Sequence, residues 1–503
     1  MKSKISLIIA VVLAVTMVVT LSMVGCKAEV AETTAAETTA AVETTAAAET
    51  TAAETTAAEE MSEALQALQS VTDKWVAIFE KDGYYDPNFD PNDFASVKSP
   101  ASAPKEIPSG QTITINWAQW APADNLAELS KDFTAETGIK VIVEQTPWET
   151  FVSKYNVELI AGSDAWDIIV ADSQDLGNMA VNGHFVEITD FIKEQKVLER
   201  FLPSAMYNYS EYPKGSGRYW NIPVEGDALG WSYRKDLFED PDNMAAFEKE
   251  YGYPLRVPQS WDEILDIAKF FHDPDNNFYG VAIYGDNGYD SLAMFAMQTI
   301  RAYGGDLGNF ETLEVDGYLN SPGAVKGLEY YRELFKYTPP GFGDAFFIHT
   351  NDAFVNGIVP MATNYFAFFP GLATAATNPH AGVTGYFTSP PQTTVDGELK
   401  QTTALGGQGA SIVKYSKKQD LALKWLEWFA RDDVQAKWGM MPGSFTCHKA
   451  TLDSQAFLDA WPFNVNMKES FEIFEDWWAV PQYDEMLRIF SEELGSYVIA
   501  GKD

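Results

Sequence analysis

The sequence predicts an α/β fold, and two observations lead to this class. Segments with the alternating or apolar pattern of strands recur between Gln111 and Val413, and segments with helical spacing separate them. The chain has 503 residues, of which 46% are hydrophobic, so it can form two domains with separate cores. Only 2 cysteines are present, so packed cores must supply the stability rather than a disulfide framework.

A βαβαβ block opens the main body. Its first helix places Leu126, Leu129 and Phe133 on one face, and Gly138 follows as a stop signal. The expected elements are strand 112–117, helix 125–137, strand 139–143, helix 151–162 and strand 166–171. After residue 419 the pattern becomes helical and rich in tryptophan.

Residues 61–110 precede this block and are expected to form an N-terminal extension. Apolar positions from Leu65 to Phe79 have the spacing of an amphipathic helix over 61–82. Proline, aspartate, serine and alanine are frequent in 83–109, which favours a loop or a second linker.

The N-terminus has the pattern of a secretory signal. Two lysines precede the apolar run 5–24, and Gly25-Cys26 ends that run. Segment 21–26 resembles a bacterial lipobox, which implies a signal peptide over 1–25 and a lipid on Cys26. The run is also long enough to span a bilayer, so an uncleaved membrane anchor is the alternative. Either arrangement places the rest of the chain outside the cytoplasm.

Residues 26–60 consist largely of Glu-Thr-Thr-Ala-Ala units and are expected to form a low-complexity linker. Across the chain, 72 acidic and 35 basic residues give a net charge of −37. Such a chain repels nucleic acid and anionic lipid headgroups, so nucleic acid is not expected as a partner.

Five segments resemble those of the family 1 extracellular solute-binding proteins and occur in that family's order. They are 133–141 (FTAETGIKV), 166–174 (WDIIVADSQ) with 180–188, 222–238 (IPVEGDALGWSYRKDLF), 258–264 (PQSWDEI) and 406–412 (GGQGASI) with the helix that follows. The resemblance extends from about Gln111 to the C-terminus. It implies the type II periplasmic-binding-protein fold, in which two α/β lobes are joined by crossing strands and a ligand cleft lies between them.

The resemblance also implies how the chain divides between the lobes. The first lobe would contain 111–224 and 395–430, and the second 225–390 and 431–503. Closure of such lobes around a ligand signals that the site is occupied. Whether the extension packs on the first lobe or only lengthens the stalk stays open.

Candidate ligand contacts follow from the positions of strand ends. Ligands of open α/β sheets lie beyond the carboxyl ends of the strands. Carboxylates and amides pair with vicinal hydroxyls, and aromatic faces cover the C–H surface of a sugar ring. After three strands, one of them expected to end near Asp227, the candidates are Trp117, Gln119, Trp120, Asp172, Ser173, Gln174 and Asp227. The alternative roles are helix capping for the carboxylates and core packing for the tryptophans.

Two further segments supply candidates. In the family, the stretch after residue 363 often carries a stacking tryptophan; here Tyr365 and Phe366 are the candidates, with core packing as the alternative for Phe366. Gly406 and Gly407 allow the backbone to approach a ligand closely beside Gln408, although a bulge or turn would use the same glycines. Trp438, Trp477 and Trp478 are expected to divide between core and cleft.

The resemblance implies a monomeric binding protein outside the cytoplasm, anchored to the membrane through Cys26. It would capture a sugar or oligosaccharide and deliver it to the permease subunits of an ABC importer. No catalytic residue, cofactor or metal is expected, because no histidine pair has ligand spacing and no nucleophile-elbow or phosphate-loop motif occurs. The alternatives are a glycan-active enzyme with a carboxylate pair, and the same fold binding a polyamine, peptide or other polar solute.

Overall fold

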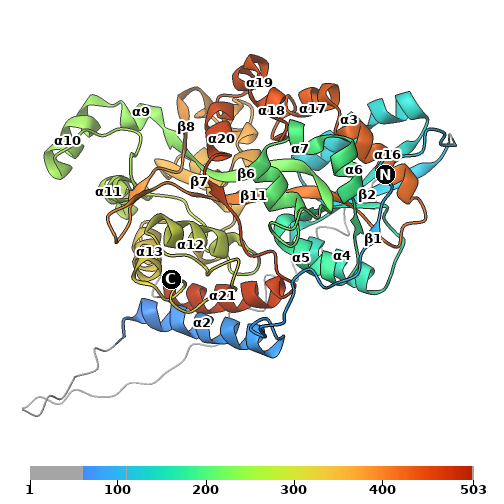
Figure 1. The fold of residues 1–503 in the computed structure, drawn as a ribbon. Coiled ribbons are helices and arrows are strands. Elements are labelled where there is room, and N and C mark those ends of the chain that lie inside the picture. The colour runs from blue at the N-terminus through green and yellow to red at the C-terminus, as the bar shows by residue number, and fades with distance from the viewer. Residues whose placement is uncertain (1–60, 109, 501–503) are drawn as a thin grey trace, which may run out of the picture. The chain divides into compact units, whose positions relative to one another are not determined.

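The computed structural model describes residues 61–108 and 110–500 (Figure 1). The expected signal peptide 1–25, the lipidation site Cys26 and the linker 26–60 lie outside these residues. None of the described helices combines the length and apolar character needed to cross a membrane.

A large mixed sheet forms the centre of the described part. Its strands follow the order β3-β2-β4-β11-β6-β7, with β12 paired to β11 and β8 paired to β6. They are β2 (Thr112–Ala118), β3 (Lys140–Thr146), β4 (Ile168–Asp172), β6 (Asn221–Arg234), β7 (Met361–Tyr365), β8 (Thr384–Thr388), β11 (Thr403–Ile412) and β12 (Phe474–Glu475). Strand β2 is parallel to β3 and β4, whereas β11 is antiparallel to both β4 and β6. Two small sheets pair β1 (Val97–Lys98) with β5 (Val186–Glu187), and β9 (Gln392–Thr393) with β10 (Leu399–Lys400).

Strand β6 connects the two ends of the large sheet. From Asn221 to Ala228 it pairs with β11, and from Leu229 onward it pairs with β7 and β8. The expectation that this strand ends near Asp227 is therefore wrong. The strand continues to Arg234 because its second half has a partner on each edge, and pairing with these distant segments is not visible in the local sequence.

Strand β11 carries an irregularity at its glycines. Its register with β6 shifts between Gln408 and Gly409, and Gly407 has a φ of 100°, which L-residues with side chains rarely adopt. A Cβ at Gly407 would also lie 2.3 Å from the Glu225 carbonyl oxygen. The bulge considered as an alternative use of these glycines is present.

The opening βαβαβ block has the predicted order of elements. Helix α3 (Ala121–Thr137) begins four residues earlier than expected, because Pro122 fits the first turn of a helix, where no N–H bond is lost. Gly138 ends the helix in the left-handed conformation with a φ of 74°, as its sequence position predicts. Helix α4 (Trp148–Ile160) likewise begins before the expected residue 151.

The remaining helices pack around the large sheet, and the last of them form the C-terminal region (Figure 1). They are α5 (Leu176–Val181), α6 (Thr189–Glu194), α7 (Val197–Arg200), α8 (Pro203–Ala205), α9 (Lys235–Phe238), α10 (Pro241–Tyr251), α11 (Trp261–Phe271), α12 (Ser291–Ala302), α13 (Pro322–Phe335), α14 (Phe347–Val355), α15 (Pro370–Ala373), α16 (Gln419–Phe429), α17 (Asp432–Trp438), α18 (Lys449–Leu452), α19 (Gln455–Ala460), α20 (Asn464–Ser470) and α21 (Tyr483–Val498).

The extension packs on the main body at both of its ends. Its helix α2 (Glu63–Lys81) lies against α13 and α21, as Figure 1 shows at the lower edge of the molecule. Its strand β1 adds to β5. The helix predicted over 61–82 is confirmed, and its apolar face is buried: Leu68, Val71, Trp75 and Phe79 are all fully inaccessible to solvent.

The tryptophans expected to divide between core and cleft all lie in the core. Trp477 and Trp478 pack against Trp75 of α2 at ring-centroid distances of 5.6 and 6.0 Å. The Trp438 indole donates to the Val224 carbonyl at 2.7 Å and is fully buried. These rings therefore stabilise the fold and leave the lining of the site to other aromatic residues.

Candidate ligand-binding site

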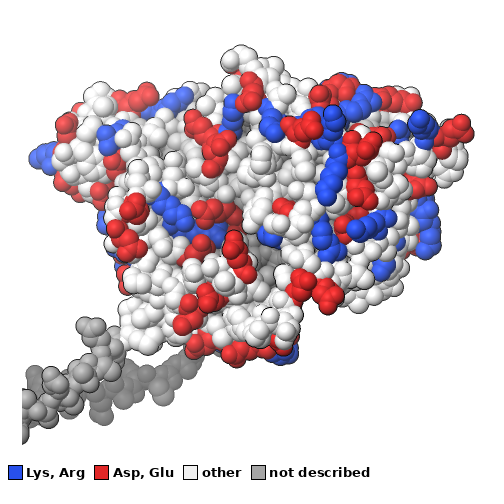
Figure 2. Space-filling view, viewed as in Figure 1, with Lys and Arg blue, Asp and Glu red and all other residues white. Residues whose placement is uncertain are grey.

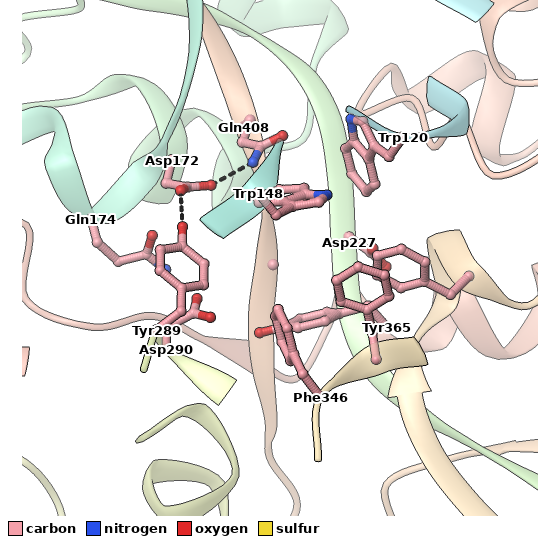
Figure 3. Close-up of a pocket in the computed structure, with 14 residues that line it drawn as sticks. Trp120, Trp148, Asp172, Gln174, Asp227, Tyr289, Asp290, Phe346, Tyr365 and Gln408 are labelled. Atoms are coloured by element: carbon pink, nitrogen blue, oxygen red, sulfur yellow. Dashed lines mark hydrogen bonds between the residues drawn. The ribbon is translucent and has the colours of Figure 1, made fainter. Parts of the chain in front are cut away.

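A cavity lies where β4, β6, β7 and β11 approach one another (Figure 3). Most of its lining is aromatic or acidic. The lining residues are Trp120, Trp148, Asp172, Gln174, Asp227, Tyr289, Asp290, Phe346, Phe347, Tyr365, Phe368, Gly406, Gly407 and Gln408.

Eight of the twelve residues predicted as ligand contacts line this cavity. They are Trp120, Asp172, Gln174, Asp227, Tyr365, Gly406, Gly407 and Gln408. They come from five separate segments of the chain, which the sheet brings to one place. Contact of each residue with a ligand stays a prediction.

Trp117 supports the wall from behind instead of forming it. Its ring is fully buried, and its indole donates to Gln408 Oε1 at 2.5 Å. Gln408 in turn donates from Nε2 to Asp172 Oδ1 at 2.5 Å (Figure 3). The core-packing alternative therefore holds for Trp117, which fixes the orientation of a lining amide.

Three other predicted residues also lie off the cavity wall. Gln119 is exposed at the end of β2, and Ser173 is buried at the turn that follows β4. Phe366 is fully buried because its ring covers Gly230 of β6, where a Cβ would lie only 2.3 Å from it. Phe368, two residues further on, reaches the cavity instead.

Six lining residues were not among the sequence candidates: Trp148, Tyr289, Asp290, Phe346, Phe347 and Phe368. Trp148 follows the end of β3 by two residues, so the strand-end rule could have found it. The others lie in loops or at the start of short helices in the middle of the chain. No local pattern marks them, because the packing of distant segments brings them to the site.

Asp172 is held by two side chains. Gln408 donates to one carboxylate oxygen, and the Tyr289 hydroxyl donates to the other (Figure 3). Burial raises the pKa of Asp172, and the two hydrogen bonds oppose that rise. The carboxylate joins the end of β4 to the loop before α12, so it connects two walls of the cavity.

Asp227 lies in the middle of β6 and is 2% exposed. Its Oδ1 accepts from the Ala228 N–H at 2.8 Å, and its two oxygens lie 3.3 and 3.4 Å from the Ala367 N–H. Burial raises the pKa of Asp227 to about 8, against the opposing effect of these backbone donors. At neutral pH this carboxyl group is therefore largely protonated and can both donate and accept.

The aromatic walls form a connected group. Trp120 and Trp148 meet edge to face at a centroid distance of 5.3 Å, and Trp120 lies 5.9 Å from Phe368. Phe368 stacks on Phe347 at 4.2 Å, with planes 11° apart. Offset and edge contacts of this kind hold ring faces in fixed positions. The arrangement suits a ligand with both C–H surfaces and polar groups.

Pockets lined by aromatic side chains and a few polar groups are typical of sites for small molecules. Residues 117–436 match the family of bacterial extracellular solute-binding proteins, and the chain belongs to this family. The members of the family bind solutes and are not enzymes.

Solved structures share the fold. A ribitol-bound ABC transporter solute-binding protein from Agrobacterium radiobacter K84 is 24% identical, covers 78% of this chain and 95% of its own, and gives a TM-score of 0.66. Maltose-bound MalE3 from T. maritima is 21% identical, covers 77% and 95%, and also gives 0.66. The fold is therefore the two-lobed periplasmic-binding-protein fold that the sequence predicts.

Curated relatives agree with the family. YcjN, an ABC transporter periplasmic-binding protein of Escherichia coli K12, is 27% identical over 48% of this chain and 51% of its own length. The maltodextrin-binding protein MdxE of Bacillus subtilis is 24% identical over 67% and 72%. The chain spans about half the length of the first curated relatives that it matches.

Proposed function

We propose that this protein captures a sugar or polyol outside the cytoplasm and delivers it to an ABC importer. The observation that carries the proposal is the cavity itself. It combines seven aromatic residues with three aspartates and two glutamine side chains. Aromatic faces and oriented carboxylate and amide groups are the complement of a ring or chain of vicinal hydroxyls.

Binding is coupled to closure of two lobes in this proposal. The lobes comprise 111–224 with 395–430, and 225–390 with 431–503. The course of β6 supports this division, because one half of the strand pairs with β11 and the other half with β7 and β8. A ligand that contacts both lobes favours the closed state by the difference between its affinities for the two states.

The location follows from the N-terminal sequence. A signal peptide over 1–25 directs export, a lipid on Cys26 anchors the mature chain, and 26–60 forms a linker to the monomeric binding unit. The anchored receptor then meets the permease subunits in the same membrane. A Cys26→Ser variant should appear in the soluble fraction of the culture, whereas the unaltered protein should sediment with membranes.

The binding test uses the purified full chain and a panel of neutral ligands. Ribitol, mannitol, glucose, maltose and maltotriose are titrated while tryptophan fluorescence is followed, and native mass spectrometry checks the stoichiometry. We expect saturable binding of at least one compound at one site per chain. Trp461→Phe serves as the control for the fluorescence measurement, because this tryptophan lies outside the cavity and stacks on Phe463. The proposal is contradicted if no compound of the panel binds and amino-bearing sugars do not bind either.

A further inference from the structure

The ionisable side chains that line the cavity, tyrosines apart, are all acidic. Among the described residues that line it, three are aspartates and none is lysine, arginine or histidine. Burial of a carboxylate without a cation is unfavourable unless the group is hydrogen-bonded, protonated or paired with a ligand. The three carboxylates can therefore be compared by what satisfies each of them.

Two of the three carboxylates are satisfied by the protein. Asp172 accepts from Gln408 and Tyr289, and Asp227 accepts from backbone N–H groups. Asp290 differs. It precedes α12, yet its side chain makes no capping hydrogen bond to that helix. Apart from its own backbone N–H, no described residue donates to its carboxylate.

Asp290 is nonetheless buried, with 9% of its surface exposed, and it lines the cavity below Tyr289 (Figure 3). The charged groups that act on it are Asp172, Asp286 and Asp476, all of them acidic. Burial and then the charge of Asp172 raise the pKa of Asp290 well above its ordinary value. A buried carboxylate with acidic neighbours and free acceptor sites is complementary to a cationic donor.

The aromatic walls favour the same kind of group. Tyr289 lies 6.3 Å from Trp148 and 6.3 Å from Phe346 by ring centroids, so three ring systems lie together beside Asp290 (Figure 3). Cations are attracted to aromatic faces, most strongly where water is excluded. A neutral hydroxyl could also bond to Asp290, but only a cation would favour the ionised carboxylate over the protonated form that burial promotes.

The surface does not oppose the approach of a cation. The protein has a net charge of −37, and Figure 2 shows acidic side chains along the lower edge of this face, where Figure 1 places α2 and α21. A field of this sign raises the local concentration of cationic solutes.

We propose that the ligand of this cavity is a small amino-bearing carbohydrate, an amino sugar or amino polyol, whose ammonium group pairs with Asp290. This inference rests on the proposed function and narrows its ligand class. The hydroxyls of the same ligand would meet Asp172, Gln408 and Asp227.

The test compares matched ligands on the purified full chain at pH 7. Glucosamine is titrated against glucose and N-acetylglucosamine, and galactosamine against galactose, by calorimetry. We expect the free amines to bind at least about tenfold more tightly than the neutral partners, a difference typical of one added charged hydrogen bond. N-acetylation should remove this preference, because it neutralises the amine.

Two variants locate the effect. Asp290→Asn should abolish the preference for the amine, so that glucosamine and glucose bind with similar affinity. Asp286→Asn is the matched control, since it removes the same charge from the same loop at a residue outside the cavity lining. It should change the amine affinity by less than about threefold, as expected for a partly screened charge. Equal effects of both variants would overturn the assignment to Asp290.

The outcomes separate this inference from the proposed function. Tighter or equal binding of neutral sugars overturns the amine assignment and leaves a sugar receptor. If putrescine or spermidine binds and no amino sugar does, the ligand is not a carbohydrate. That result overturns the carbohydrate ligand in both the proposed function and this inference. Failure of every sugar and every amine to bind overturns the proposed function itself.

Discussion

Two aromatic clusters of this protein differ in what surrounds them. Under α2, Trp75 packs on Trp477, Trp478 and Phe490, and all four rings are nearly or completely buried. The single polar atom of Trp75 is satisfied, because its indole donates to the Met486 carbonyl at 3.1 Å. In the cavity, aromatic residues stand beside buried carboxylates and empty space.

The difference shows that aromatic content alone does not locate a binding site. Both clusters draw on the same residue types, and both include residues far apart in the chain. The α2 cluster fills its volume, although the indole N–H groups of Trp477 and Trp478 have no hydrogen-bond partner among the described residues. A binding site leaves volume and hydrogen-bonding capacity for a ligand, which lowers the stability of the unliganded protein.

The largest expected effect is on the α2 cluster. Trp75→Ala should lower the free energy of unfolding by about 3–5 kcal/mol, because it removes a fully buried ring from a packed core. Chemical denaturation followed by circular dichroism measures this. Val76→Ala on a more exposed face of the same helix should cost less than about 1.5 kcal/mol. A loss for Trp75→Ala as small as that of the control would mean that the extension is not part of the cooperative unit.

Asp227→Asn should have the opposite effect and raise the free energy of unfolding at neutral pH. The pKa of this carboxyl is about 8 in the folded protein against 3.8 in an unperturbed chain, so folding takes up a proton between these values. The contribution of Asp227 to the free energy of unfolding is then fully present below pH 3.8 and declines toward pH 8, by at most about 1.4 kcal/mol per pH unit.

The asparagine variant does not titrate, so its stability relative to the unaltered protein should increase from pH 4 to pH 8. Urea denaturation at several pH values within this window gives the two curves. Parallel curves would show that Asp227 is ionised in the folded protein at neutral pH.

Within the cavity, Trp120→Ala should weaken ligand binding by about tenfold, close to 1.4 kcal/mol, because a ring face is lost from the wall. Titration calorimetry with the ligand found in the screen measures the change. Trp120→Phe should retain part of the affinity, since it keeps an aromatic face of smaller area. An unchanged affinity for Trp120→Ala would place the ligand elsewhere.

The smallest expected effect is that of Tyr289→Phe. The variant removes the hydroxyl that donates to Asp172 and should lower the free energy of unfolding by about 1 kcal/mol. Tyr483→Phe provides the comparison, because no hydrogen bond of its hydroxyl occurs among the described residues and its removal should change little. Similar losses for both variants would mean that the Asp172 contact contributes nothing to stability.

The sequence predicts the parts of the fold that depend on neighbours in the chain. The βαβαβ block from Thr112 to Asp172 and the amphipathic α2 show their periodicity locally, and Gly138 marks the end of α3 through its own conformational preference. The length of β6 is not predictable in this way, because its second half is stabilised by pairing with β7 and β8, which lie more than a hundred residues further along.

The same distinction holds for the site. Trp120, Asp172 and Gln174 follow parallel strands, so the topology of the sheet predicts that they lie together. Tyr289 and Phe346 reach the cavity through loops whose positions depend on the packing of the whole second half of the chain. Their side chains carry no signal that distinguishes them from other aromatic residues.

The extension has a mechanical consequence. Tyr84 donates to Gln482 Oε1 at 3.0 Å beside α21, whereas Phe94 stacks on Trp220 and lies under the Arg218 guanidinium at 4.1 Å. The Tyr85 hydroxyl donates to the Leu313 carbonyl, and the Asn92 carbonyl accepts from Arg218. Between these two contacts the chain spans about seven residues, which can extend to roughly 25 Å at most. This loop connects the α21 side of the molecule to the β5 side. If the lobes of the proposed function move apart, the length of this loop limits how far its two attachment points can separate.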